Sequence, residues 1–194
     1  MKLIWEDIYK IEDDTLKGKI EKFQNEYNIK FPQLYLEMIY KKAKRVLSCE
    51  VMKKDYKCNE DREEIYFNTF QEGKINNMFI SNEMSDDVRP KGIIFFAYTS
   101  GGDAFAFDFK DNPNDPKIVF YNHDIVPPRE NVEYDEIKLQ GIEETQRKYY
   151  KTVYDNIEDL YNHLEIAQKY WIEEEYGSED NKELLEYIKK WCIE

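Results

Sequence analysis

The sequence is poor in the residues that build metal sites, disulfide frameworks and membrane spans. Its 194 residues include two histidines and three cysteines. Three cysteines form an odd and sparse set, so we expect free thiols. The longest apolar run is residues 93–98, far short of the roughly 20 residues that cross a bilayer, and acids occur among the first ten residues, unlike a signal peptide. We therefore expect a cytoplasmic protein that does not bind membranes.

The shortage of histidine also limits the chemistry that the chain can perform. His123 and Asp124 are adjacent, as in metal-dependent phosphohydrolases, but such sites need a further histidine upstream and the sequence has none before His123. Cys49 and Cys58 lack a Cys-x-x-Cys partner pair, and no glycine-rich phosphate loop is present. We expect no metal, no cofactor and no catalysis. A Cys58 nucleophile assisted by His123 stays open as an alternative, with ordinary thiols favoured.

The chain also has fewer basic residues than acidic ones, 28 Lys and Arg against 41 Asp and Glu. The formal net charge is −13 and the pI is about 4.8, which opposes binding to phosphate backbones and favours basic partners. Residues 155–194 contain 12 acids and 4 bases, a net charge of −8. Residues 41–57 reverse the sign, with seven Lys or Arg against two acids. We interpret that stretch as a helix end followed by a loop rather than as a nucleic-acid arm.

Apolar residues spaced by three or four positions predict helices at both ends of the chain. One helix is expected over residues 15–27, and a second begins at Pro32 and continues to Ala43. A third is expected from Asn156, an N-cap candidate, and Gly177 ends it. An acidic helix carrying Leu184, Ile188 and Trp191 follows.

The middle of the chain predicts a β-meander. Residues 92–98 form a continuous apolar run, and in residues 104–109 the phenylalanines alternate with other residues, which places Phe105, Phe107 and Phe109 on one core-facing side. Gly101 and Gly102 supply the positive-φ residues of a tight turn, and residues 117–121 form the third strand. Short strands are also expected at residues 64–70 and 78–81.

Together these segments predict an α+β fold in one domain spanning residues 1–194. Its mainly antiparallel sheet packs against N-terminal and C-terminal helices. The polar segment 126–140 is a crossover between the meander and the last helices.

Four short motifs occur in an order that resembles the SUKH superfamily, which groups Smi/Knr-type regulators of yeast cell-wall synthesis with many bacterial immunity proteins. They cover about residues 15–167, whereas residues 177–194 form an acidic helical extension. The Asn-Gly-Gly turn that usually follows the second helix of that family is absent and is replaced by the basic residues 41–45 and an insertion to about residue 61. The motifs are Phe31-Pro32-Gln33-Leu34-Tyr35-Leu36-Glu37, the strand Gly92 to Phe96, Gly102-Asp103-Ala104-Phe105-Ala106-Phe107-Asp108 and Asn156-Ile157-Glu158-Asp159-Leu160.

The resemblance implies a non-enzymatic binding protein. In bacterial members the role is typically to bind and neutralise a toxin domain, often a nuclease or a deaminase, and the acidic charge suits a basic toxin partner. The alternative is a regulatory or scaffold protein of the Smi/Knr type with no toxin partner. An enzyme would instead depend on Asp103, Asp108 or His123.

The expected partner-binding surface combines acidic and aromatic residues near the open side of the meander. For Asp103 and Asp108, turn and cap hydrogen bonds are the favoured role, and Asp103 is also a candidate for partner contact. The candidate contacts are Glu83, Asp86, Asp87, Tyr98 and Asp103.

Overall fold

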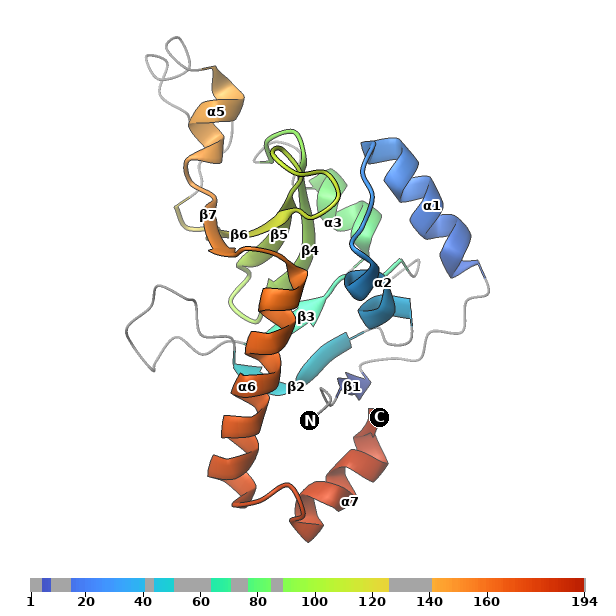
Figure 1. Cartoon of the computed structure of the whole chain (residues 1–194), viewed down its shortest axis with the longest axis vertical. Helices are drawn as coiled ribbons and strands as arrows, with labels where there is room; N and C mark the ends of the chain where they lie inside the picture. The colour runs from blue at the N-terminus through green and yellow to red at the C-terminus, as the bar shows by residue number, and fades with distance from the viewer. Residues whose placement is uncertain are drawn as a thin grey trace.

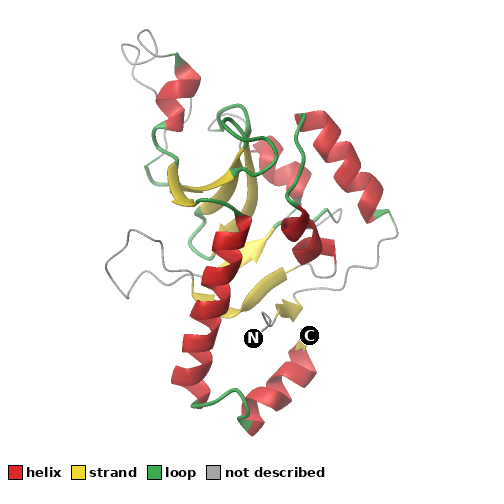
Figure 2. Cartoon of the chain, in the orientation of Figure 1, coloured by secondary structure: helices red, strands yellow, loops and turns green. Residues whose placement is uncertain are grey.

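The structure is a computed structural model that describes residues 5–7, 15–40, 44–50, 64–70, 77–84, 89–125 and 141–193. Its centre is an eight-stranded antiparallel sheet in the order β7-β6-β5-β4-β3-β2-β1-β8 (Figure 1). The strands are β1 (Trp5–Asp7), β2 (Lys44–Glu50), β3 (Glu64–Phe67), β4 (Ile93–Thr99), β5 (Ala104–Asp108), β6 (Lys117–Tyr121), β7 (Lys151–Tyr154) and β8 (Cys192–Ile193). The helices are α1 (Leu16–Tyr27), α2 (Gln33–Tyr40), α3 (Met78–Met84), α5 (Ile142–Arg147), α6 (Ile157–Tyr176) and α7 (Lys182–Trp191). The α+β prediction is confirmed (Figure 2).

The N-terminal helices follow the predicted spacing. Leu16, Ile20 and Phe23 of α1 are buried on one side, and the helix ends at Asn28, whose φ of 51° is left-handed. In α2 the backbone N–H of Leu36 donates to Pro32 O at 3.1 Å, so Pro32 stands where its missing N–H costs nothing. The predicted extension of this stripe to Ala43 lies outside the described residues.

The first C-terminal helix also matches its predicted limits. Asn156 caps α6, because its Oδ1 accepts from the backbone N–H of Asp159 at 2.9 Å. Gly177 ends α6 in the left-handed conformation with φ 74°, and α7 follows after a short turn. The side chains Ile157, Leu160, Leu164, Gln168 and Ile172 are buried along one side of α6.

The meander is present as predicted. β4, β5 and β6 pair in sequence order, with Phe107 opposite Ile94 on one neighbour and Ile118 on the other. The two sides of these strands carry different clusters. Phe105, Phe107 and the α6 side chains belong to the larger cluster.

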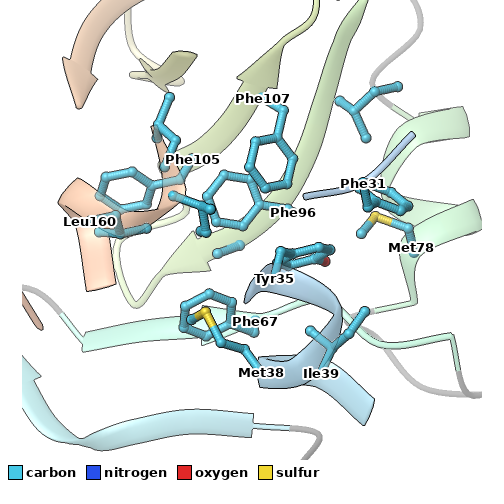
Figure 3. Close-up of a cluster of buried hydrophobic side chains, with 14 of the residues drawn as sticks. Phe31, Tyr35, Met38, Ile39, Phe67, Met78, Phe96, Phe105, Phe107 and Leu160 are labelled. Atoms are coloured by element: carbon cyan, nitrogen blue, oxygen red, sulfur yellow. The ribbon is translucent and has the colours of Figure 1, made fainter. Parts of the chain in front are cut away.

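The larger cluster is rich in aromatic rings. Phe96 and Phe107 stack with centroids 4.2 Å apart, and Tyr35 of α2 contacts both rings at 5.6 and 5.1 Å (Figure 3). Tyr35 is fully buried, and burial raises the pKa of its hydroxyl well above 10. The Tyr35 that resembles a family motif is therefore a core residue.

The opposite side of the meander is buried as well, which corrects the expectation of a single core face. Ile93, Phe95, Ala104, Ala106 and Val119 form a second cluster with Tyr150, the residue just before β7. Phe and Ala alternate in β5, so the side chains on its two sides differ in size. The small alanines are nevertheless as inaccessible to solvent as the phenylalanines. The partly buried side chains Tyr98, Tyr121 and Tyr149 pack against this cluster.

Two segments differ from prediction. Met78–Met84 is the helix α3, not a strand, and Asn77 caps it by accepting from the backbone N–H groups of Phe79 and Ile80 at 2.9 and 3.2 Å. Lys44–Glu50 is the strand β2, not a helix end and loop. β2 pairs with β1 on one side and with β3 on the other, so pairing with distant segments determines its conformation.

Residues 141–154 contain α5 and β7, neither of which was predicted. Arg147 of α5 donates to Asp108 Oδ1 at 2.6 Å and to Lys91 O at 2.6 Å, which ties α5 to the meander. The predicted crossover 126–140 and the part of the predicted insertion that follows β2, residues 51–61, lie outside the described residues. The first and last described strands, β1 and β8, pair with each other at one end of the sheet.

Candidate functional site

The β4–β5 turn places Asp103 at the rim of the sheet. The backbone N–H of Gly102 donates to Thr99 O at 3.2 Å, and the N–H of Thr99 donates to Asp103 O at 2.8 Å. Gly102 has φ 90°, the left-handed conformation that a three-residue hairpin loop requires at its last position. Of the two glycines predicted to supply positive φ, only Gly102 does so.

Asp103 holds the chain that leaves β6. Its Oδ1 accepts from the backbone N–H of His123 at 3.0 Å and lies 2.9 Å from Nδ1 of the same residue. The Nε2 of His123 lies 3.1 Å from Asp124 Oδ1. Asp103 is 5% exposed, so its carboxylate faces His123 and offers little surface to a partner. The two contacts of Asp103 with His123 therefore join the β4–β5 turn to the segment that follows β6.

Asp108, the other family-matched carboxylate, is also engaged within the protein. Its Oδ1 accepts from the backbone N–H of Lys110 at 3.0 Å as well as from Arg147 at 2.6 Å. The Arg147 and Asp108 side chains are 14% and 19% exposed. These contacts fix α5 against β5 and give Asp108 a positioning role.

Tyr98 belongs to a row of tyrosines that crosses the second face of the sheet. In the strand register Tyr98 lies opposite Tyr66 on β3 and opposite Ala104 on β5, and Ala104 lies opposite Tyr121 on β6. The ring of Phe95 lies 6.0 Å from that of Tyr98 and 5.2 Å from that of Tyr121. Tyr98 and Tyr121 are half-buried, so this tyrosine row exposes only part of each ring.

The structure describes one of the three remaining predicted contacts. Glu83 is exposed on α3, a separate element from the hairpin that carries Tyr98 and Asp103. Asp86 and Asp87 lie outside the described residues, as does Cys58. The structure thus brings Tyr98 and Asp103 to one end of the β4–β5 hairpin, and the predicted five-residue surface stays a prediction.

A second surface lies outside the five predicted contact residues. From Glu173 to Glu186, seven carboxylates are exposed and one lysine lies among them. We call residues 173–186, the end of α6 and the first half of α7, the acidic arm. Lys182 Nζ lies 4.0 Å from Glu186 Oε1. Because it is the one lysine among seven carboxylates, the arm stays strongly negative. Its acids are Glu173, Glu174, Glu175, Glu179, Asp180, Glu183 and Glu186.

Next to the acidic arm, two apolar residues of α6 face solvent. Ile166 is 57% exposed and Tyr170 is 64% exposed. The exposure of these two residues could have been predicted from the sequence, because both fall between the positions that the apolar stripe of α6 assigns to the core. Sequence reasoning counted the acids of this region but did not consider these two residues.

Within the described residues, no group of three or more His, Cys, Asp or Glu side chains is arranged to hold a metal ion. None of the helices in the described part of the chain is long and apolar enough to cross a membrane.

A family model matches residues 16–162, from the start of α1 to the first turns of α6. The chain belongs to the SMI1/KNR4 family (SUKH-1). The match contains the Asp103 hairpin and the tyrosine row, and it confirms the resemblance found in the sequence. Ile166, Tyr170 and the acidic arm lie beyond it. No curated protein matches the chain in a sequence comparison.

Proposed function

We propose that this SMI1/KNR4-family protein is a non-enzymatic immunity protein, which binds and neutralises a cognate bacterial toxin domain of the nuclease or deaminase class in the cytoplasm. The observation that carries the proposal is the acidic arm of a family member whose net charge is −13. Exposed charges of one sign attract a partner of the opposite sign and accelerate its association.

The charge also suggests how binding could neutralise a toxin. Nucleases and other enzymes that act on nucleic acids need basic surfaces, because phosphate contacts supply much of their affinity. An acidic protein can cover such a surface as a competing polyanion. The proposed contact therefore blocks substrate entry and requires no chemistry from the immunity protein.

The polar groups of the hairpin support a binding role over a catalytic one. Asp103 and Asp108 each accept hydrogen bonds that link separate segments, and the two ring nitrogens of His123 lie 2.9 and 3.1 Å from carboxylate oxygens of Asp103 and Asp124. A general base needs a nitrogen or oxygen atom that can accept a proton from a substrate within hydrogen-bond distance. These side chains act as positioning groups in the proposal.

The test is co-expression and affinity capture with the products of neighbouring genes. We expect the protein to capture a product with a basic domain and to abolish its toxicity, with weaker capture at high salt because screening shortens the range of the charges. Capture of no such product would reject the proposal, and several weak, salt-insensitive partners would support a Smi/Knr-type regulatory role instead. A toxin rescued equally by an unrelated acidic protein would reject a cognate interaction.

A further inference from the structure

The solvent-facing side of α6 has an apolar centre. Ile166 is two residues from both Leu164 and Gln168, which are buried. At about 100° per residue, Ile166 lies about 200° around the helix axis from each of them. Tyr170 follows one turn later on the same side. The two side chains form one stripe directly opposite the core, and we call Ile166 and Tyr170 the α6 stripe.

The α6 stripe has a polar border. A surface hollow is lined, among the described residues, by the stripe together with Lys169 and Glu173. Lys169 Nζ lies 3.8 Å from Glu173 Oε1, so this lysine partly neutralises the carboxylate that lines the hollow. An apolar centre that contains an aromatic ring, surrounded by charged groups, is the usual composition of a protein interface.

The acidic arm continues directly from the α6 stripe. Glu173 lines the hollow beside the stripe and is also the first residue of the arm, and the exposed acids from Glu174 to Glu186 extend the negative charge along the chain. α6 has 20 residues and is therefore about 30 Å long, and the stripe and the first acids of the arm lie between its midpoint and its C-terminal end. The stripe supplies apolar area and the arm supplies charge.

The tyrosine row offers a weaker docking surface. Tyr98 is half-buried and Asp103 is 5% exposed, whereas Tyr170 is 64% exposed. The stripe also lies outside the residues matched by the family model. The shared fold therefore does not account for an isoleucine and a tyrosine at these solvent-facing positions.

We infer that the α6 stripe and the acidic arm form the docking surface for a basic protein domain, with the stripe as the apolar centre of the interface and the arm as its charged border. This inference rests on the proposed function and names the surface that performs it. A second copy of the chain fits less well, because it would bring two acidic arms of the same sign together. Lys and Arg side chains of a basic domain complement the arm.

Paired substitutions test the stripe. Ile166→Ser with Tyr170→Ser removes its apolar area, and we expect the Kd for the purified basic domain encoded by the neighbouring gene to rise about tenfold or more. The matched control is Ile80→Ser with Ile125→Ser, which removes apolar side chains that are 41% and 51% exposed on other elements. We expect the control to bind within about twofold of the unmodified protein.

Charge-neutralising substitutions test the arm. Glu175→Gln, Glu179→Gln and Asp180→Asn together should slow association at low salt by about fivefold and flatten its salt dependence, since long-range attraction acts mainly on the association rate. The control with the same change in charge is Asp111→Asn, Asp115→Asn and Glu143→Gln, at exposed positions away from the arm. Circular dichroism melts establish that each variant is folded.

The outcomes separate the two proposals. If the unmodified protein binds no basic domain, the proposed function fails and the docking surface fails with it. If the unmodified protein binds and the stripe variant binds equally well, only the docking surface is overturned. Conversion of a dimer to a monomer by the stripe variant, measured by light scattering, would show that the stripe joins two copies and would also overturn it.

Discussion

The side-chain amide of Asn82 pairs with the backbone of Phe95 as a neighbouring strand would. Its Nδ2 donates to Phe95 O at 2.9 Å, and its Oδ1 accepts from Phe95 N at 2.9 Å. β3 pairs with β4 only as far as Phe67 opposite Ala97, and the next bond runs from Asn68 N to Phe96 O at 2.8 Å. Asn82 therefore extends the ladder past the end of β3 and attaches α3 to the edge of β4.

Replacement of Asn82 by Ala should lower the free energy of unfolding by about 1–3 kcal/mol, because the buried N–H of Phe95 is left without its acceptor. Asn82→Asp should be at least as destabilising, since an oxygen then faces both Phe95 O and Met78 O, to which Nδ2 now donates. Urea unfolding measures both. The control is the exposed neighbour Glu83→Ala, expected within about 0.5 kcal/mol of the parent. Equal midpoints for Asn82→Ala and Glu83→Ala would contradict this.

The Asp103–His123 contact should be measurable as a coupling energy. Asp103→Ala removes the acceptor for both the backbone N–H and the ring of His123, whereas His123→Ala keeps the backbone bond and should cost less stability. A double-mutant cycle should give a coupling of about 0.5–3 kcal/mol. If Asp103→Ala instead leaves stability unchanged and weakens partner capture, Asp103 is an interface residue, as the sequence analysis also allowed.

Two glycines should respond to alanine in opposite directions. Gly102→Ala forces a side chain into the left-handed region at φ 90° and should destabilise the protein by about 1–2 kcal/mol. A Cβ at Gly18 in α1 would meet no atom within 4 Å apart from the backbone of its own helix turn, so Gly18→Ala should stabilise by about 0.4–1 kcal/mol through lower entropy of the unfolded chain. Thermal melts measure both signs. A stabilising Gly102→Ala would refute the assigned turn.

The hydroxyl of Tyr35 is buried without a hydrogen-bond partner among the described residues. Tyr35→Phe removes that unpaired polar group and should raise stability by about 1 kcal/mol. Burial raises the pKa of Tyr35, so the fold requires its neutral form and stability falls as pH rises above about 10, less steeply in the variant. Absorbance at alkaline pH supplies the check: folded parent and variant should show the same number of titrating tyrosines. One fewer in the variant would show that Tyr35 ionises in the folded protein.

The elements predicted well from sequence are those whose pattern is local. The spacing of Leu16, Ile20 and Phe23 determines α1, and Asn156 with Gly177 determines the limits of α6. The alternation in β5 correctly identified one side of the sheet, because strand side chains point alternately to opposite faces.

The elements that were missed depend on long-range contacts or on a signal that was interpreted differently. Asn77 caps α3, but Asn is as typical of a turn as of an N-cap, and the short run from Met78 to Ser81 does not distinguish a strand from a helix. β2 forms a strand because β1 and β3 pair with it on both sides. No local sequence pattern predicts such pairing.

The candidate surfaces also combine features that the sequence shows locally with features that only the folded chain shows. The chemistry of Asp103 and Asp108 as turn carboxylates was deducible from the motif that contains them, but their partners His123 and Arg147 lie 20 and 39 residues away. The acidity of the arm is visible in the sequence. The exposure of Ile166 and Tyr170 follows only after the core side of α6 has been assigned from Leu160, Leu164 and Gln168.

The pairing of Trp5 with Ile193 sets an order of events during synthesis. The two residues are 188 positions apart, so at about 5–20 residues per second β1 emerges from the ribosome about 10–40 s before its outer partner. During that interval β1 has one neighbour, β2, and its outer backbone edge is open to pairing with other chains. The nascent protein therefore exposes the outer edge of β1 until β8 covers it at Trp5 and Glu6.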